Sequence, residues 1–399
     1  MNKIIVVLLA IPSLVWGQTS DSAADANKDN PWYKRFTIRG YVQVRYNRLL
    51  ETNPNLKNDQ GDKSIGKNGG MSIRRARIIL SGQLNNHVYF YFQPDFAASP
   101  SSDDLHFGQI RDAYIDVSFD KKREYRVRLG QSKVPYGFEA MQSSSNRMPL
   151  DRSDGINSAF VNERDLGAYF YYAPAKIRAR FAWLLSEGLK GSGDYGVAAF
   201  GVLNGQGANR PEKNEGMHVV ARLSYPFAIK KQIIEAGIQA YSGMFTLTDR
   251  HLSGKVKIED DHTYEDKRVA ASFILYPQPF GFQAEYNIGR GPQYDPALDS
   301  IVHKSLQGGY VMASFRKKIN RQVFIPFSRF HYYDGGKKFE QDARAYLVRE
   351  LEIGLEWQPS KYFELVAMYT ISHRRTADFM NENNDQKGNL LRLQAQLNF

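Results

Sequence analysis

The chain has 399 residues and a formal net charge of +11, and it contains 24 tyrosines and 24 phenylalanines but no cysteine. The lack of cysteine excludes a disulfide-stapled domain and a thiolate site, and the dispersal of lysine and arginine along the chain argues against nucleic acid as a partner. A negative mean hydropathy with a single long apolar run excludes a helical membrane protein. Many aromatic residues in a chain that is polar on average suit a β-barrel, in which half of each strand faces lipid and half faces water.

Residues 1–17 have the order of a secretory signal peptide. Lys3 supplies the positive charge, residues 4–11 form an apolar run, and a small residue precedes the expected cleavage before Gln18. The run is shorter than the roughly 20 apolar residues that a membrane-spanning helix needs, and no cysteine is present to carry a lipid anchor. A buried N-terminal helix is the alternative. Residues 18–35 are expected to form an N-terminal periplasmic segment, whose polar first part is disordered.

From residue 36 onward, apolar and polar residues alternate in segments of about ten residues, and this period predicts β-strands. The alternation is regular in the last segment, where Leu391, Leu393, Leu397 and Phe399 share one face. The terminal Phe399 is similar to the C-terminal signal of outer-membrane barrels, so the barrel-assembly machinery is an expected partner. The sequence therefore predicts an all-β protein, a transmembrane antiparallel β-barrel over residues 36–399, in the bacterial outer membrane.

Sixteen strands are expected because short and long connections alternate, as periplasmic turns and extracellular loops do in single-chain barrels. Splitting 177–204 in two would give an odd number, so this segment is taken as one strand. Eighteen strands remain possible if a hairpin is missed. Long loops are expected at 49–70, 97–108, 134–165, 205–214, 246–266, 291–305, 334–343 and 374–387. The expected strands are 36–48, 71–84, 86–96, 109–119, 123–133, 166–174, 177–204, 215–226, 231–245, 267–277, 279–290, 306–317, 321–333, 344–357, 360–373 and 388–399.

The alternation also assigns strand residues to the lipid face or to the lumen. An arginine on the lipid face at the bilayer midplane costs roughly 2–4 kcal/mol, so the strand arginines are placed inside. A ladder of guanidinium groups along the pore would favour anions. The alternative is that these arginines pair with acids and only stiffen the wall. The predicted ladder is Arg39, Arg45, Arg75, Arg77, Arg126, Arg128, Arg178 and Arg180, and the lumen acids are Asp112, Asp116, Glu285, Glu350, Glu352 and Glu356.

The longest expected loop, residues 134–165, is rich in cations, and loops of this length are rarely without a function. Lys133, Arg147, Arg152 and Arg164 lie in it or beside it. Folded inward, the loop would narrow the pore and place these cations at a constriction. Folded outward, it would decorate the surface or contact another subunit. The inward fold is favoured.

Several short motifs occur in a consistent order in the first half of the chain. They are residues 73–77 (IRRAR), 89–96 (YFYFQPDF), 111–116 (RDAYID), 129–139 (LGQSKVPYGFE) and 163–167 (ERDLG). Together they resemble the phosphate-selective porins O and P, over about residues 36–175. The resemblance implies a sixteen-stranded barrel, usually a homotrimer, with inward-folded loops and a lumen arginine ladder that conducts phosphate or related anions.

The resemblance assigns the ladder role to Arg75 and Arg77, and more loosely to Arg126 and Arg128, with Lys133 and the loop cations at the constriction. The acids of segment 344–357 depart from the pattern of that family.

The predicted function is a water-filled porin that prefers anions such as phosphate and works by passive diffusion. The alternatives are a channel for sugars, carboxylates or solutes in general, and a surface scaffold or adhesin. We expect no enzyme, cofactor or metal site, since no Ser–His pair has a third member to orient it. His251 and His262 lie in an acidic loop segment, where solvated side chains are favoured over a divalent-cation or lipopolysaccharide contact. Small anions and outer-membrane lipid are the remaining expected partners.

Overall fold

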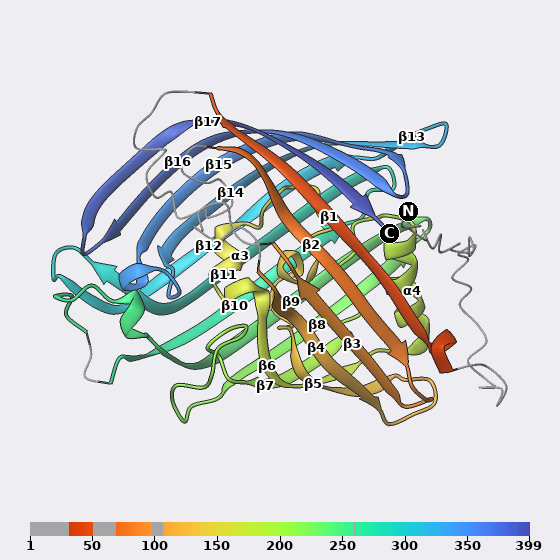
Figure 1. Cartoon of the computed structure of the whole chain (residues 1–399), viewed down its shortest axis with the longest axis horizontal. Coiled ribbons are helices and arrows are strands. Elements are labelled where there is room, and N and C mark those ends of the chain that lie inside the picture. Colours follow the sequence, from red (N-terminus) through yellow and green to blue (C-terminus); the bar gives the residue numbers. More distant parts are fainter. Residues whose placement is uncertain (1–31, 51–68, 98–106, 259–260) are drawn as a thin grey trace, which may run out of the picture.

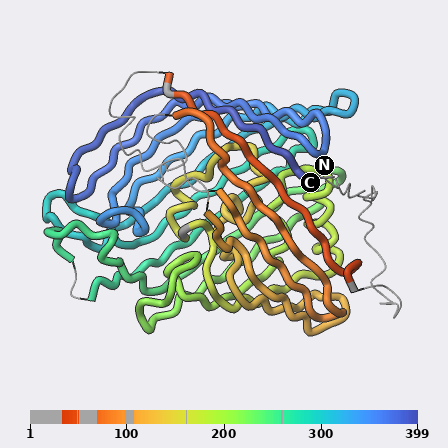
Figure 2. The backbone as a smooth tube through the Cα atoms, viewed as in Figure 1, coloured from red at the N-terminus to blue at the C-terminus, as the bar shows by residue number. Residues whose placement is uncertain are grey.

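A computed structural model describes residues 32–50, 69–97, 107–258 and 261–399. In this part of the chain the strands form one closed antiparallel sheet, in which the first strand pairs with both the second and the last. The barrel wall is seen in Figure 1 and, as a tube, in Figure 2. The predicted signal peptide, 1–17, and most of the predicted segment 18–35 lie outside the described residues. The last residues of that segment, Trp32–Arg35, form a 3-10 turn, η1.

The prediction of sixteen strands is confirmed. β12 and β13 pair with consecutive parts of β14 and are therefore two segments of one strand. The strands are β1 (Phe36–Leu49), β2 (Gly70–Gln83), β3 (Val88–Asp95), β4 (Gln109–Ser118), β5 (Tyr125–Lys133), β6 (Arg164–Tyr172), β7 (Ala198–Leu203), β8 (His218–Ile229), β9 (Gln232–Thr246), β10 (Thr263–Leu275), β11 (Phe280–Asp295), β12 (Ser300–Phe315), β13 (Lys317–Ile319), β14 (Gln322–Gly336), β15 (Ala345–Ser360), β16 (Phe363–Asp378) and β17 (Asn381–Asn398).

The two ends of the barrel differ in their connections. The end that holds β17's C-terminus has tight turns at 230–231, 320–321 and 361–362, and we name it the turn end. The opposite end, the loop end, carries long connections such as 134–163 and 204–217. Two segments predicted as long loops, 291–305 and 374–387, are instead mostly strand, because β11–β12 and β16–β17 remain paired as hairpins through most of these residues.

The prediction of one strand over 177–204 is wrong. Residues Ala175–Ser186 form helix α4, and only β7 is strand. Ile177, Phe181 and Leu184 are the helix's buried residues. Their spacing of four and three residues is helical. Every second residue from 177 to 183 is also apolar, however, and this period of two indicates a strand, which is why the sequence pattern is ambiguous here. α4 lies at the turn end, where β17 finishes (Figure 1). None of the helices in the described ranges is long and apolar enough to cross a membrane.

Burial alternates along the strands as the sequence predicts. In β17, Leu390, Arg392, Gln394 and Gln396 are buried inside, while Leu393 and Leu397 are exposed on the outer face. The inner positions are polar and yet buried, because two segments fill much of the barrel. One is the connection 134–163, which enters from the loop end with helices α2 (Phe138–Met141) and α3 (Asp154–Asn157). The other is 173–197, which carries α4 and enters from the turn end.

Candidate functional site: the lumen and its two chambers

The connection 134–163 folds inward, as favoured from the sequence. Backbone N–H groups of Phe138 and Glu139 donate to the Glu285 carboxylate on β11, at 2.5 and 3.1 Å. Helix α3 lies so close to β12 that a Cβ on Gly155 would be 2.5 Å from the carbonyl carbon of Gly308. The connection is therefore a fixed part of the lumen and crosses it from the β5–β6 wall.

Four of the eight predicted ladder arginines, Arg45, Arg77, Arg126 and Arg128, point inward from strands and are paired with carboxylates. Arg45 binds Asp151 on the inward connection at 2.9 Å, and Arg77 binds Asp95 at 2.8 Å. Arg128 binds the predicted lumen acid Asp116. The contact that Arg126 makes at 2.6 Å is to Asp194, in the segment that enters from the turn end. These four guanidinium groups are buried and each has a carboxylate partner, so much of their charge is compensated inside the barrel.

Two predicted ladder residues are not on the wall. Arg178 and Arg180 belong to α4, because the segment is helical. Arg178 binds Asp194 at 2.8 Å, and Arg180 donates to the carbonyl of Pro226. They hold the helix at the turn end and do not form a rung of a strand ladder.

The predicted constriction cations lie close together in the lumen. Lys133 and Arg164 end β5 and begin β6, and Arg152 lies on the connection between them. The Lys133 ammonium donates to the carbonyls of Met141 and Gln142, at 2.8 and 2.5 Å. Arg152 and Arg164 both bind Glu163, and Arg164 also binds Asp112 on β4. Burial alone would raise the pKa of Glu163, but these arginines outweigh it and hold that pKa well below its usual range.

Two cavities lie along the lumen, one toward each end. The loop-end chamber, of about 380 Å³, is lined by Arg75 on β2, by Arg147 and Arg152 of the inward connection, and by Lys337 of the loop 337–344. The turn-end chamber, of about 230 Å³, is lined by Arg39, Arg77 and Lys133. The loop-end chamber is lined by nine lysines or arginines and six aspartates or glutamates. The turn-end chamber is lined by five lysines or arginines and two aspartates. Each chamber therefore has three more cations than carboxylates.

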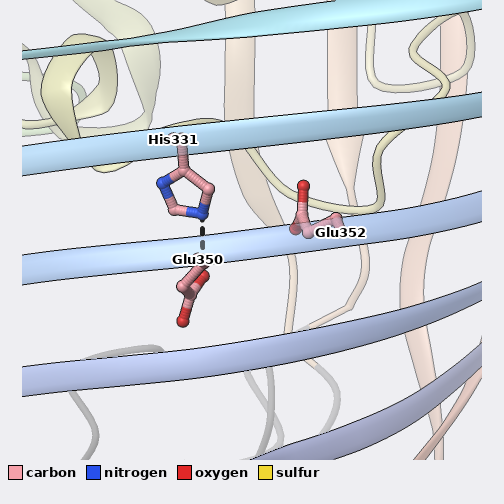
Figure 3. Close-up of side chains that lie close together, drawn as sticks. All are labelled: His331, Glu350 and Glu352. Carbon is pink, nitrogen blue, oxygen red and sulfur yellow. Dashed lines mark hydrogen bonds and ion pairs between the residues drawn. The ribbon is translucent and has the colours of Figure 1, made fainter.

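A cluster of possible metal ligands lies on β14 and β15. Donor atoms of His331, Glu350 and Glu352 lie within 4.8 Å of one another (Figure 3). However, Arg374 binds Glu350 at 2.6 Å, and Arg329 binds Glu352 at 2.6 Å. These guanidinium groups occupy the carboxylates, so the cluster is an ion-pair network of the wall.

The sequence analysis missed several arginines that the same reasoning places in the lumen, among them Arg222 and Arg268 on β8 and β10 and Arg329 and Arg374 on β14 and β16. Arg329 and Arg374 alternate with outward-facing Phe330 and Arg375 on β14 and β16. Both are at most 4% exposed. The period of two, applied to these strands, was the signal that finds them. Asp194 had no such signal, because its segment was assigned to a strand.

The sequence profile of the family "phosphate-selective porin O and P" matches residues 55–399. The chain belongs to this family. The family places it in the bacterial outer membrane and indicates a channel rather than an enzyme. No match was found among curated proteins.

Solved porin structures share the fold at low sequence identity. The outer membrane channel DcaP of Acinetobacter baumannii is 16% identical with a TM-score of 0.55, over 91% of this chain and 97% of that one. The trimer form of OmpT, an outer membrane protein of Vibrio cholerae, is 10% identical with a TM-score of 0.52, over 91% and 99%. An anion-selective porin from Comamonas acidovorans is also 10% identical with a TM-score of 0.52, over 91% and 99%. These likenesses support the closed barrel.

Proposed function

We propose that the protein is an anion-preferring diffusion channel for phosphate or similar small anions, which pass along the lumen arginines. The observation that carries this proposal is a pair of uncompensated arginines in the loop-end chamber. Arg75 and Arg147 both line this chamber and are only 5% and 4% exposed. Within the described residues, neither forms an ion pair.

The hydrogen-bonding capacity of these two arginines is largely unused. Arg75 donates from Nη1 to Gln43 at 2.8 Å, and its Nε has no partner among the described residues. Arg147 donates from Nη2 to the Leu150 carbonyl at 3.3 Å, and its Nε and Nη1 have none there. A guanidinium with free N–H groups in a sheltered chamber binds oxyanions through charge-assisted hydrogen bonds. Phosphate has the oxygens to accept several of them.

The excess of cations in both chambers supports the same direction of selectivity. Cations that line a pore attract anions and repel cations. One protein of similar fold is an anion-selective porin. We extend that property to this chain as part of the proposal.

We also propose that the turn end faces the periplasm, since short turns lie there in outer-membrane barrels. A homotrimer is proposed because a solved barrel of this fold exists in a trimer form. Assembly through Phe399, lipid on the outer face and the signal peptide at 1–17 belong to the same proposal. The second candidate, a channel for neutral solutes, is favoured by the pairing of Arg45, Arg77 and Arg128 with carboxylates.

The reversal potential in planar bilayers under a KCl gradient tests the proposal, with phosphate added as a competitor of chloride current. We expect anion selectivity and block by phosphate. Replacing either Arg75 or Arg147 by Gln should weaken the block about tenfold or more, because a hydrogen bond to a charged group contributes about 1.5–3 kcal/mol. Arg290→Gln removes the same charge from the exposed outer face of β11 and should leave the block unchanged. A channel without anion preference would overturn the proposal and favour the neutral-solute channel.

A further inference from the structure

Residues 187–197, which we name the strap, cross the interior of the barrel between α4 and β7. Gly188 has a φ of +65°, the left-handed conformation that commonly ends a helix, so the chain leaves α4 at this residue. The strap was predicted to be part of a strand. Its side chains instead contact opposite parts of the barrel wall.

The first part of the strap is fixed to β15 and β16. Lys190 is 1% exposed, and its ammonium lies 2.5 Å from a carboxylate oxygen of Glu356 and 3.8 Å from one of Glu364. Both carboxylates are buried. A lysine at this depth with two acidic partners is a strong attachment, because removing it would leave buried charges unpaired.

The second part of the strap is fixed to β5 and β8. The Asp194 carboxylate accepts from Arg126 at 2.6 Å, and Arg222 donates to the Gly196 carbonyl at 2.7 Å. β5 and β8 are far from β15 and β16 in the order of the sheet. The strap therefore spans the lumen and does not lie along one side of it.

The strap also contacts the connection that enters from the loop end. The side-chain amides of Gln142 and Asn146 donate to the carbonyls of Lys190 and Gly191, at 2.5 and 2.7 Å. Phe138 packs in one apolar cluster with residues of α4 and with Leu189. The two segments, which enter from opposite ends, thus hold each other inside the barrel.

The strap forms one side of the turn-end chamber. Residues 192–195 line this chamber together with Arg39 and Arg77 of β1 and β2. We propose that the strap is a second constriction, which confines permeating ions to the turn-end chamber beside β1–β5 and thereby sets conductance and anion preference. Lys190 and Asp194 are the positioning residues that hold it. The inference rests on the channel function proposed above.

The lack of cysteine in the chain makes a direct test possible. Tyr195→Cys places a single thiol on the strap where it lines the turn-end chamber. After reaction with a small thiosulfonate reagent, positively or negatively charged, we expect single-channel conductance to fall by about half or more. The negative adduct should also lower anion preference relative to the positive one. Ser186→Cys, exposed at the end of α4, is the matched control and should conduct equally before and after labelling.

A second variant tests the attachment. Lys190→Met with Glu356→Gln removes one charge of each sign and with them the ion pair that fixes the first part of the strap. We expect this part to be held less firmly and the conductance to rise, up to about twofold. Fully labelled Tyr195→Cys protein with unchanged conductance and selectivity would overturn the inference. Its failure is distinguishable from that of the proposed function, because the unaltered protein's reversal potential tests anion preference without any change to the strap.

Discussion

Gly40 and Phe399 close the barrel through a reciprocal pair of backbone hydrogen bonds. The N–H of Gly40 donates to the Phe399 carbonyl at 2.8 Å, and the N–H of Phe399 donates to the Gly40 carbonyl at 3.0 Å. The Phe399 ring lies against Gly40, where a Cβ would be 2.6 Å from a ring carbon and 2.4 Å from the Arg77 carbonyl oxygen. The seam between the first and last strands therefore has room only for glycine at this position.

Gly40→Val should destabilise the seam by about 1–3 kcal/mol, because a side chain forced into packed space displaces its neighbours. The change is measured as a lower temperature at which the folded barrel loses its compact migration on a gel. Gly254→Val is the control, since a Cβ at Gly254 meets nothing within 4 Å. Equal loss of stability in both variants would mean that the seam is not the cause.

Arg329 should be the main attachment of the inward connection to β14. It binds Glu139 of α2 and, at 2.6 Å, Glu352 of β15. Arg329→Met leaves two buried carboxylates unpaired, and removing one partner of such a pair costs about 3–5 kcal/mol. We expect the Arg329→Met variant to be cleaved faster by proteases within residues 134–163, and mass spectrometry of the fragments measures this rate. The double variant with Glu352→Gln should recover part of the loss, and additivity of the two changes would contradict the coupling.

The strands of the barrel wall were predictable from the sequence, because one face of each strand contacts lipid and apolar residues therefore recur at every second position. Arg75, Arg77, Arg126 and Arg128 were placed inside by that rule alone, and the structure has them buried there. The partners of these arginines were not predictable. Asp95 comes from a neighbouring strand, but Asp194 reaches Arg126 across many residues of chain, and no local period encodes such a contact.

The helix α4 shows where the period fails. Ile177 and Phe181 satisfy both a period of two and a helical spacing of four, so the sequence around them does not distinguish strand from helix. The helix forms because Ile177, Phe181 and Leu184 find an apolar cluster with Phe138 and Tyr276 at the turn end. The members of that cluster come from α4, from the barrel wall and from the inward connection, so no local stretch of sequence contains it.

The attachment of the strap at Asp194 should persist into mildly acidic solution. Burial alone raises the pKa of this carboxyl, but Arg126 and Arg178 outweigh it, so the pKa lies well below its ordinary value. A group with a lowered folded-state pKa stabilises the fold above its unfolded pKa of about 3.9, and the contribution is lost as pH falls through the folded value. We expect constant conductance between about pH 7 and pH 5, whereas Asp194→Asn should alter conductance at neutral pH. A change in conductance near pH 6 in the unaltered channel would contradict this account.

The position of Arg147 should depend on the contact between Gly155 and β12. A Cβ on Gly155 would lie 2.5 Å from the carbonyl carbon of Gly308 and 2.6 Å from the nitrogen of Gly309, and backbone atoms cannot move aside as a flexible side chain does. Gly155→Ala should therefore push α3 away from β12 and shift the connection that carries Arg147. We expect the block of chloride current by phosphate to weaken about threefold or more, because a displacement of binding groups by about 1 Å is enough to produce such an effect. The measurement is the phosphate concentration that halves chloride current. Gly108→Ala, where a Cβ has only ordinary contacts at 3.8 Å with Phe96, is the control. If Gly155→Ala leaves phosphate block intact while Arg147→Gln weakens it, α3 does not position the arginine, and the connection is held by its ion pairs instead.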